Sequence, residues 1–200
     1  MNAIDFYFDF SSPYGYLAST QIDQLAAKHD RKVKWRPYLV GTAMKATGHQ
    51  PLFNTPLLHD YVVIDVPRFA RLLGVPFQLP ESFPLVASAA SRAFYWLERR
   101  DESEQAGQFA RNTYHAFFVE GRDISKTDEL RTIAETVGVD GEELIRAIQD
   151  PETKSLFKEK NDAALARGVF GSPYMIVEGQ PFWGADRLYQ LDQWLETGGW

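Results

Sequence analysis

The order of hydrophobic patterns along the chain limits its fold more than any other feature. Residues 3–10 and 32–38 read as strands, and residues 14–30 between them have apolar side chains near helical spacing. A strand, a helix and a strand in this order favour a parallel strand pair joined by a right-handed crossover. The start of the chain therefore predicts a β-α-β unit.

The end of the chain adds a second strand-bearing segment. A long helix is expected from Pro151, with Gly168 as its stop, and it is followed by YMIVEGQPFW, residues 174–183. That stretch has two short apolar runs around Glu178-Gly179, which is typical of a β-hairpin. A last helix is expected over residues 186–195, so this end reads α-β-β-α.

The middle of the chain reads as helical after an irregular start. Residues 41–61 are rich in Pro, Gly and Thr and predict a loop. Helices are expected at 61–73, 85–99, 104–118, 127–137 and 142–148. The last of them has Asp140 as its cap and Glu143 three residues later.

Removing the helical block leaves β-α-β-α-β-β-α, which is the thioredoxin topology. The expected fold class is therefore α/β, a thioredoxin-like fold with a large all-helical insertion. Residues 1–42 and 151–200 would form the discontinuous thioredoxin-like domain, and residues 43–150 the insertion.

Composition excludes several kinds of chemistry. The chain has no cysteine, which removes thiol catalysis, cysteine metal ligands and disulfides, and its four histidines show no metal-binding spacing. The net charge is −6 without a basic cluster, so a nucleic-acid partner is not expected. No apolar run approaches the roughly 20 residues that span a membrane. The N-terminus does not resemble a signal peptide, so we expect a cytoplasmic protein.

Three short motifs could carry chemistry at the expected sheet edge. In a thioredoxin topology the site lies where the first strand meets the first helix, and SSP, residues 11–13, occupies that junction. Ser12 is the better candidate than Ser11 because Pro13 makes it the helix N-cap. A serine hydroxyl there could donate a hydrogen bond to a thiolate that a cofactor brings in, or it could simply cap the helix.

The other two motifs lie near the C-terminus. Ser172-Pro173 stands just before a strand, where a thioredoxin-like fold has its cis-proline loop, although an ordinary turn would look similar. Asp186, in GAD, could cap the last helix or bind a ligand ammonium group.

Together these motifs resemble a known family. DFYFDFSSPYGYLA at the start and GVFGSPYMIVEGQPFWGADRL at the end are similar to the 2-hydroxychromene-2-carboxylate isomerases, which are related to kappa-class glutathione transferases and DsbA-like proteins. The resemblance implies a homodimeric enzyme that uses glutathione and acts in the degradation of aromatic compounds. Its implied reaction is the isomerisation between 2-hydroxychromene-2-carboxylate and trans-o-hydroxybenzylidenepyruvate.

The resemblance also implies roles for particular residues. Ser12 would support the glutathione thiolate, and Ser172, before Pro173, would pair its backbone with the cysteinyl part. Ala185 and Asp186 would hold the γ-glutamyl end, with Asp186 taking the α-ammonium group.

Two positions depart from the family pattern. The stretch GHQP has His49 where an asparagine is often found near the glycine end of glutathione, and LLHDY has Leu58 where a lysine is common. These departures keep two other functions open. One is a kappa-like glutathione transferase, which would consume glutathione, and the other is a catalytically silent thioredoxin-like binding protein.

Overall fold

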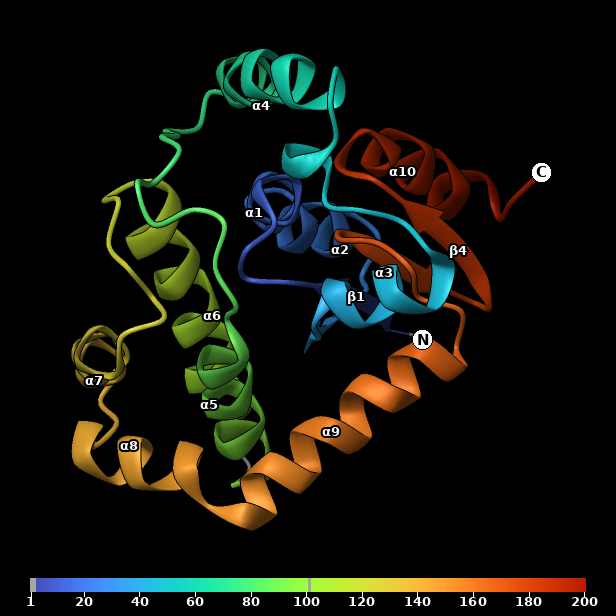
Figure 1. Ribbon diagram of the computed structural model, residues 1–200. Coiled ribbons are helices and arrows are strands. Elements are labelled where there is room, and N and C mark those ends of the chain that lie inside the picture. Colours follow the sequence, from blue (N-terminus) through green and yellow to red (C-terminus); the bar gives the residue numbers. More distant parts are fainter. Residues whose placement is uncertain (1–2, 101) are drawn as a thin grey trace. The chain divides into compact units, whose positions relative to one another are not determined.

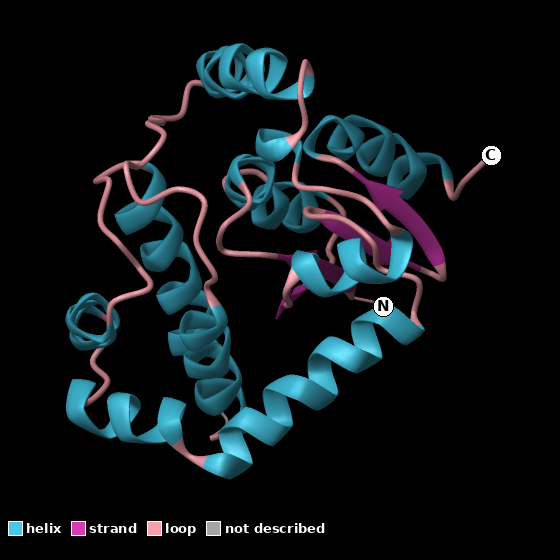
Figure 2. Cartoon of the chain, viewed as in Figure 1, coloured by secondary structure: helices cyan, strands magenta, loops and turns pink. Residues whose placement is uncertain are grey.

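The computed structural model describes residues 3–100 and 102–200. Its mixed four-stranded sheet has the order β2-β1-β3-β4 (Figures 1 and 2). The strands are β1 Ile4–Phe8, β2 Val33–Pro37, β3 Tyr174–Val177 and β4 Gln180–Trp183. Strand β3 runs antiparallel to both of its neighbours, with Met175 opposite Phe6 on β1 and Phe182 on β4.

Helices occupy most of the remaining described chain. The α-helices are α1 Pro13–Ser19, α2 Ile22–Lys28, α3 Val40–Thr47, α4 Leu58–Leu73, α5 Ser88–Arg99, α6 Ser103–Phe118, α7 Thr127–Thr136, α8 Gly141–Gln149, α9 Pro151–Ala166 and α10 Leu188–Thr197. Two short 3-10 helices, η1 Leu52–Asn54 and η2 Ala185–Arg187, complete the set. Within residues 3–100 and 102–200, no helix combines the length and apolarity needed to cross a lipid bilayer.

The expected thioredoxin-like architecture is confirmed, and local signals explain why. Asp140 caps α8 by accepting a hydrogen bond from the Glu143 N–H at 2.9 Å. Gly74, with φ 68°, ends α4 in the left-handed conformation that suits glycine. Glu178 and Gly179 both have positive φ, at 52° and 83°, as a two-residue hairpin turn requires.

The single helix expected at residues 14–30 is wrong, because the structure has two shorter helices there. The Ser19 and Thr20 hydroxyls bond back to carbonyls three residues earlier, at 2.7 Å each. The Gln21 N–H also bonds three residues back, to Ala18 at 3.0 Å. Such local bonds compete with regular α-helical pairing and break the helix between α1 and α2.

The loop expected at residues 41–61 is also wrong for much of its length. It contains α3 and η1, and α4 begins within it at Leu58. Ala43, Met44 and Lys45 are good helix formers, and their preference outweighed the surrounding Gly, Thr and Pro signals.

The described chain contains two compact units, which we call the sheet unit and the helical unit. The sheet unit comprises Met1–Arg36, Val40–Val75 and Gly168–Trp200, and the helical unit comprises Pro37–Leu39 and Pro76–Arg167. This division differs from the expected domains, since residues 43–75 fall in the sheet unit and residues 151–167 in the helical unit.

Each unit has its own aromatic core. In the sheet unit, Phe6, Phe8 and Phe10 on and just after β1 are fully buried, and the Phe6 and Phe8 rings lie 5.2 and 5.3 Å from Trp35 of β2. Helices α1, α2 and α10 group beside the sheet (Figure 1). The aromatic core fixes the end of β1, from which the candidate site begins.

Candidate functional site

Ser12 lies at the junction between β1 and α1, as expected. Its backbone is extended, with φ −89° and ψ 115°, and Pro13 is the first helical residue. The Ser12 Oγ accepts a hydrogen bond from the Gly15 N–H at 3.0 Å, so Ser12 is the N-cap of α1. This confirms the capping role, and the half-buried hydroxyl still has a proton to donate.

That proton goes to a residue 160 positions away in the sequence. The Ser12 hydroxyl donates to the main-chain carbonyl of Ser172 at 2.9 Å. The Ser172–Pro173 bond is cis, which is the cis-proline loop of the two alternatives that the sequence left open. The structure thus brings two of the expected site residues into direct contact in the sheet unit.

A buried acid that the sequence did not single out supports this contact. Asp9 follows β1 directly and is only 3% exposed. Its N–H donates to the Ser172 Oγ at 2.9 Å, and its carbonyl accepts from the Ser12 N–H at 2.8 Å. Together with the Ser12–Ser172 bond, these two interactions form a closed ring of three hydrogen bonds among Asp9, Ser12 and Ser172.

The Asp9 carboxylate ties further segments to this ring. One oxygen accepts from the N–H and the hydroxyl of Ser11, at 2.9 and 2.8 Å, and the other accepts from the Val40 N–H at 2.9 Å, where α3 begins. Burial raises the pKa of Asp9, while the hydrogen bonds from Ser11 and Val40 oppose that rise. Asp9 therefore fixes the positions of Ser11–Ser12, the start of α3 and Ser172.

Aromatic side chains surround the loop that carries Ser172. The Phe170 ring packs against Trp183 and Tyr174, with centroids 4.8 and 5.2 Å apart. A side chain at Gly171 would collide with the indole of Trp183, so glycine is required for this close approach. Trp183 itself is 55% exposed.

Ala185 and Asp186 lie in η2, which contacts α1. Ala185 is buried, whereas the Asp186 side chain is 64% exposed and lies 3.7 Å from Arg187. Asp186 does not cap a helix, because η2 has Gly184 at its N-cap position and α10 has Arg187, neither with a side-chain cap bond. Of the two roles left open by the sequence, the capping role is therefore not seen in the structure.

Gly184 leaves space for the Asp186 carboxylate beside its backbone. With φ 113° and ψ 149°, Gly184 has a conformation that other residues rarely adopt. A side chain at this position would also collide with the Asp186 Oδ1. The carboxylate therefore lies directly over the Gly184 backbone.

The two departures from the family pattern lie in the sheet unit but outside the hydrogen-bonded ring. His49 is exposed, and its Nδ1 lies 2.8 Å from the Thr47 hydroxyl. Leu58 is 43% exposed at the start of α4 and has no charge to offer a carboxylate. His59 beside it has its Nδ1 2.8 Å from the Phe53 carbonyl. Among the interactions of residues 3–100 and 102–200, none joins His49, Leu58 or His59 to Ser12.

A second polar contact that the sequence did not reveal joins α1 to α4. The Tyr14 hydroxyl donates to Asp65 at 2.7 Å, and the Tyr61 hydroxyl donates to the same carboxylate at 3.1 Å. Burial raises the pKa of Tyr14, and the hydrogen bond to Asp65 and the negative charges of Asp65 and Asp186 raise it further. Tyr14 therefore stays protonated at neutral pH and acts as a donor.

Tyr14→Phe is expected to lower the free energy of unfolding by about 1–2 kcal/mol, because it removes a half-buried hydrogen bond to a charged acceptor. Tyr61→Phe removes an exposed bond to the same carboxylate and should have a smaller effect. Urea unfolding of both variants measures the difference. Equal losses of unfolding free energy in the two variants would show that the Tyr14 bond contributes no more to stability than the exposed Tyr61 bond.

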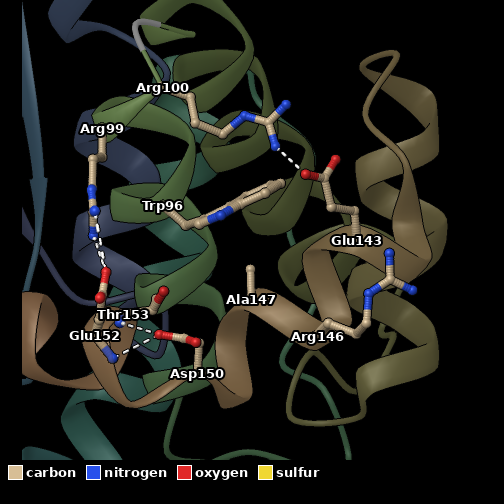
Figure 3. Close-up of a pocket in the computed structure, with 9 residues that line it drawn as sticks. All are labelled: Trp96, Arg99, Arg100, Glu143, Arg146, Ala147, Asp150, Glu152 and Thr153. Carbon is tan, nitrogen blue, oxygen red and sulfur yellow. Dashed lines mark hydrogen bonds and ion pairs between the residues drawn. The ribbon is translucent and has the colours of Figure 1, made fainter.

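A hollow of about 630 Å³ lies entirely within the helical unit (Figure 3). Its lining is Trp96, Arg99, Arg100, Glu143, Arg146, Ala147, Asp150, Glu152 and Thr153. Glu143 pairs with Arg100, Glu152 pairs with Arg99, and Asp150 caps α9. These carboxylates already have structural partners, and the lining contains none of the expected site residues.

Comparison with known proteins agrees with the geometry. The family described as "DSBA-like thioredoxin domain" matches residues 3–196. The chain is 34% identical to the 2-hydroxychromene-2-carboxylate isomerase of Sphingobium xenophagum, over 96% of this chain and 97% of that protein. It is 25% identical to glutathione S-transferase kappa 1 of Rattus norvegicus, over 94% and 88% of the two chains.

A solved structure of 2-hydroxychromene-2-carboxylate isomerase superposes with a TM-score of 0.88 at 25% identity. The match covers 98% of this chain and 95% of that one. The similarity therefore extends over both compact units as well as over the short motifs.

Proposed function

The chain belongs to the 2-hydroxychromene-2-carboxylate isomerase family of DSBA-like thioredoxin-domain proteins and is an isomerase, and from this premise we propose its reaction. It interconverts 2-hydroxychromene-2-carboxylate and trans-o-hydroxybenzylidenepyruvate, with glutathione as cofactor. The observation that carries this proposal is the half-buried Ser12 hydroxyl, placed 2.9 Å from the backbone carbonyl that precedes Pro173.

The residues present fit glutathione in their hydrogen-bonding chemistry. Ser12 supplies a hydroxyl donor for a thiolate, and Ser172 supplies a main-chain carbonyl and N–H for an extended peptide. The exposed Asp186 carboxylate suits an α-ammonium group. Since the chain has no cysteine, the sulfur must come from the cofactor.

Bound glutathione would supply a thiolate that adds reversibly to the conjugated double bond, so that the bond can rotate before the thiolate leaves. The role of the protein is to keep that sulfur ionised and correctly oriented. Ser12 donates to it, Asp9 holds the Ser11–Ser12 turn and Ser172 in register, and Ser172 aligns the tripeptide. A donor fixed in advance stabilises developing charge without reorganising at each turnover.

His49 belongs to the same proposal as the residue nearest the glycine end of glutathione. Leu58 cannot replace the cation that the family pattern has at its position, so the hold on the glycine carboxylate should be weaker. A homodimer in the cytoplasm is likewise proposed from the resemblance, and light scattering on the purified protein would test the dimer.

A glutathione transferase is the second candidate, because kappa-class transferases are among the relatives. The two functions differ in the fate of the cofactor, since a transferase consumes glutathione and an isomerase returns it. The test incubates the protein with glutathione and 2-hydroxychromene-2-carboxylate, follows both isomers by absorbance, and titrates the remaining thiol. Isomerisation with a constant thiol concentration supports the proposal. Loss of thiol indicates a transferase, and no reaction despite correct folding indicates a silent binding protein.

Asp186→Asn is expected to weaken glutathione binding by about two- to fivefold, the size of an exposed ion pair. Isothermal titration should compare glutathione with an analogue that lacks the α-ammonium group. Wild type should prefer glutathione, and Asp186→Asn should bind the two ligands alike. An unchanged preference in the variant would remove Asp186 from the proposed site.

A further inference from the structure

The Ser12 hydroxyl has one proton but two possible acceptors, the Ser172 carbonyl and the thiolate of the proposed cofactor. A serine hydroxyl donates a single hydrogen bond, and here that bond goes to the Ser172 carbonyl at 2.9 Å. Under the proposed function the same proton must point to a thiolate. The two bonds exclude each other, so thiolate stabilisation requires that the Ser172 carbonyl give up its donor.

The released carbonyl then needs a replacement. In the described chain, Ser12 is the only donor to the Ser172 carbonyl, and Ser172 is half-buried. Leaving this partly buried carbonyl without a donor would cost free energy unless another donor replaces Ser12. An amide N–H of a bound peptide is the natural substitute, because the ligand arrives at the same backbone.

Ser172 has a second main-chain group suited to such a peptide. Over residues 3–100 and 102–200, its N–H has no hydrogen-bond acceptor, and its side-chain oxygen is already held by the Asp9 N–H at 2.9 Å. A carbonyl acceptor and a free N–H on one residue match the donor and acceptor of an extended ligand, as in strand addition.

The surrounding contacts keep Ser12 in place during this change. The Gly15 N–H bonds to a lone pair of Ser12 Oγ at 3.0 Å, and the Ser12 N–H bonds to the Asp9 carbonyl at 2.8 Å. Neither bond uses the hydroxyl proton. The O–H can therefore rotate while the oxygen stays where it is.

We propose that the Ser12 hydroxyl holds the Ser172 carbonyl until an amide N–H of the cofactor takes it over, and that only then is the hydroxyl free to stabilise the thiolate. This inference rests on the proposed function. It makes the amide next to the cysteinyl sulfur a requirement for activation, so a thiol without that N–H binds without being ionised efficiently.

The test compares glutathione with its ester analogue, in which an oxygen replaces the N–H between the γ-glutamyl and cysteinyl parts. The thiol pKa of each bound ligand is read from thiolate absorbance during a pH titration. Relative to each free ligand, we expect wild type to lower the thiol pKa of glutathione by about one unit more than that of the ester analogue, roughly a tenfold difference in ionisation. On Ser12→Ala the two shifts should coincide.

Two further variants serve as controls for this comparison. Ser11→Ala removes the neighbouring hydroxyl, which donates to Asp9 and not to Ser172, and should keep the difference between the two ligands. Ser12→Thr retains a hydroxyl and should keep it as well. Circular dichroism confirms that each variant is folded.

Each outcome decides a different statement. If calorimetry detects no glutathione binding to wild type, both the proposed function and the exchange fail. A second outcome is that glutathione binds with a lowered thiol pKa that depends on Ser12, but the ester analogue is ionised equally well. In that case the proposed function stands, and the proposed exchange of Ser12 for a cofactor N–H at the Ser172 carbonyl is wrong. A difference between ligands that persists in Ser12→Ala also overturns the exchange.

Discussion

Ser12→Ala is expected to lower kcat/KM for glutathione-dependent isomerisation by about 10- to 100-fold. Under the proposed function, the variant loses a hydrogen bond to the glutathione thiolate, worth about 1.5–3 kcal/mol, and each 1.4 kcal/mol corresponds to about a factor of ten. Initial rates at saturating glutathione, followed by absorbance of the isomers, measure the loss. A rate within about twofold of wild type would remove Ser12 from the chemistry.

The control must account for the second role of Ser12, which is to cap α1. Loss of a cap alone costs about 1 kcal/mol of stability. Asp140→Ala removes the cap of α8 in the helical unit and should cause a similar loss of stability. If its activity stays normal, the fall in Ser12→Ala reflects the thiolate and not the cap.

Asp9→Ala is expected to have the largest effect on stability, lowering the free energy of unfolding by about 3 kcal/mol or more. Its carboxylate accepts from two partly buried backbone N–H groups, of Ser11 and Val40, and from the Ser11 hydroxyl, and each partner that is left without its acceptor costs up to about 1–3 kcal/mol. Asp5→Ala, on the same strand, breaks a partly exposed pair with Arg36 and should cost about 1 kcal/mol. Urea unfolding gives both values, and equal losses would contradict the special role of Asp9.

The dependence on pH gives Asp9 a separate signature. Its pKa is raised in the folded state, so folding favours the protonated form. Wild type should therefore have its greatest advantage in stability over Asp9→Asn below about pH 4, the ordinary range of an aspartate. The advantage should shrink as the pH rises through the folded pKa. Unfolding curves for both proteins across acidic and neutral pH test this, and an advantage that grows with pH would reverse the sign.

Features of the fold that depend on neighbouring residues could be predicted from sequence. The cap at Asp140, the stop at Gly74 and the turn at Glu178-Gly179 each act within a few residues. The order of strands and helices followed from the spacing of apolar residues, which is also a local feature. Helix α3 could not be found in the same way, because helix formers and turn residues alternate through its segment and no local signal decides between them.

The same distinction between local and long-range signals applies to the residues of the candidate site. Ser12 and Ser172-Pro173 carry local signatures, a helix cap and a proline before a strand. Asp9 looks like any polar residue at a strand end, and only its partners Val40 and Ser172, distant in sequence, show that it is buried. The Tyr14–Asp65 bond spans 51 positions and is equally invisible without coordinates.

The glycine that lets an indole approach the Ser172 loop gives the protein an optical reporter. Because Trp183 is half exposed and lies against Gly171, its fluorescence depends on the water around that loop. If a ligand binds at Ser172 as proposed, it should displace some of this water and shift the emission, so that binding can be followed without a dye or turnover. Trp183→Phe identifies the responding fluorophore among the five tryptophans of the chain.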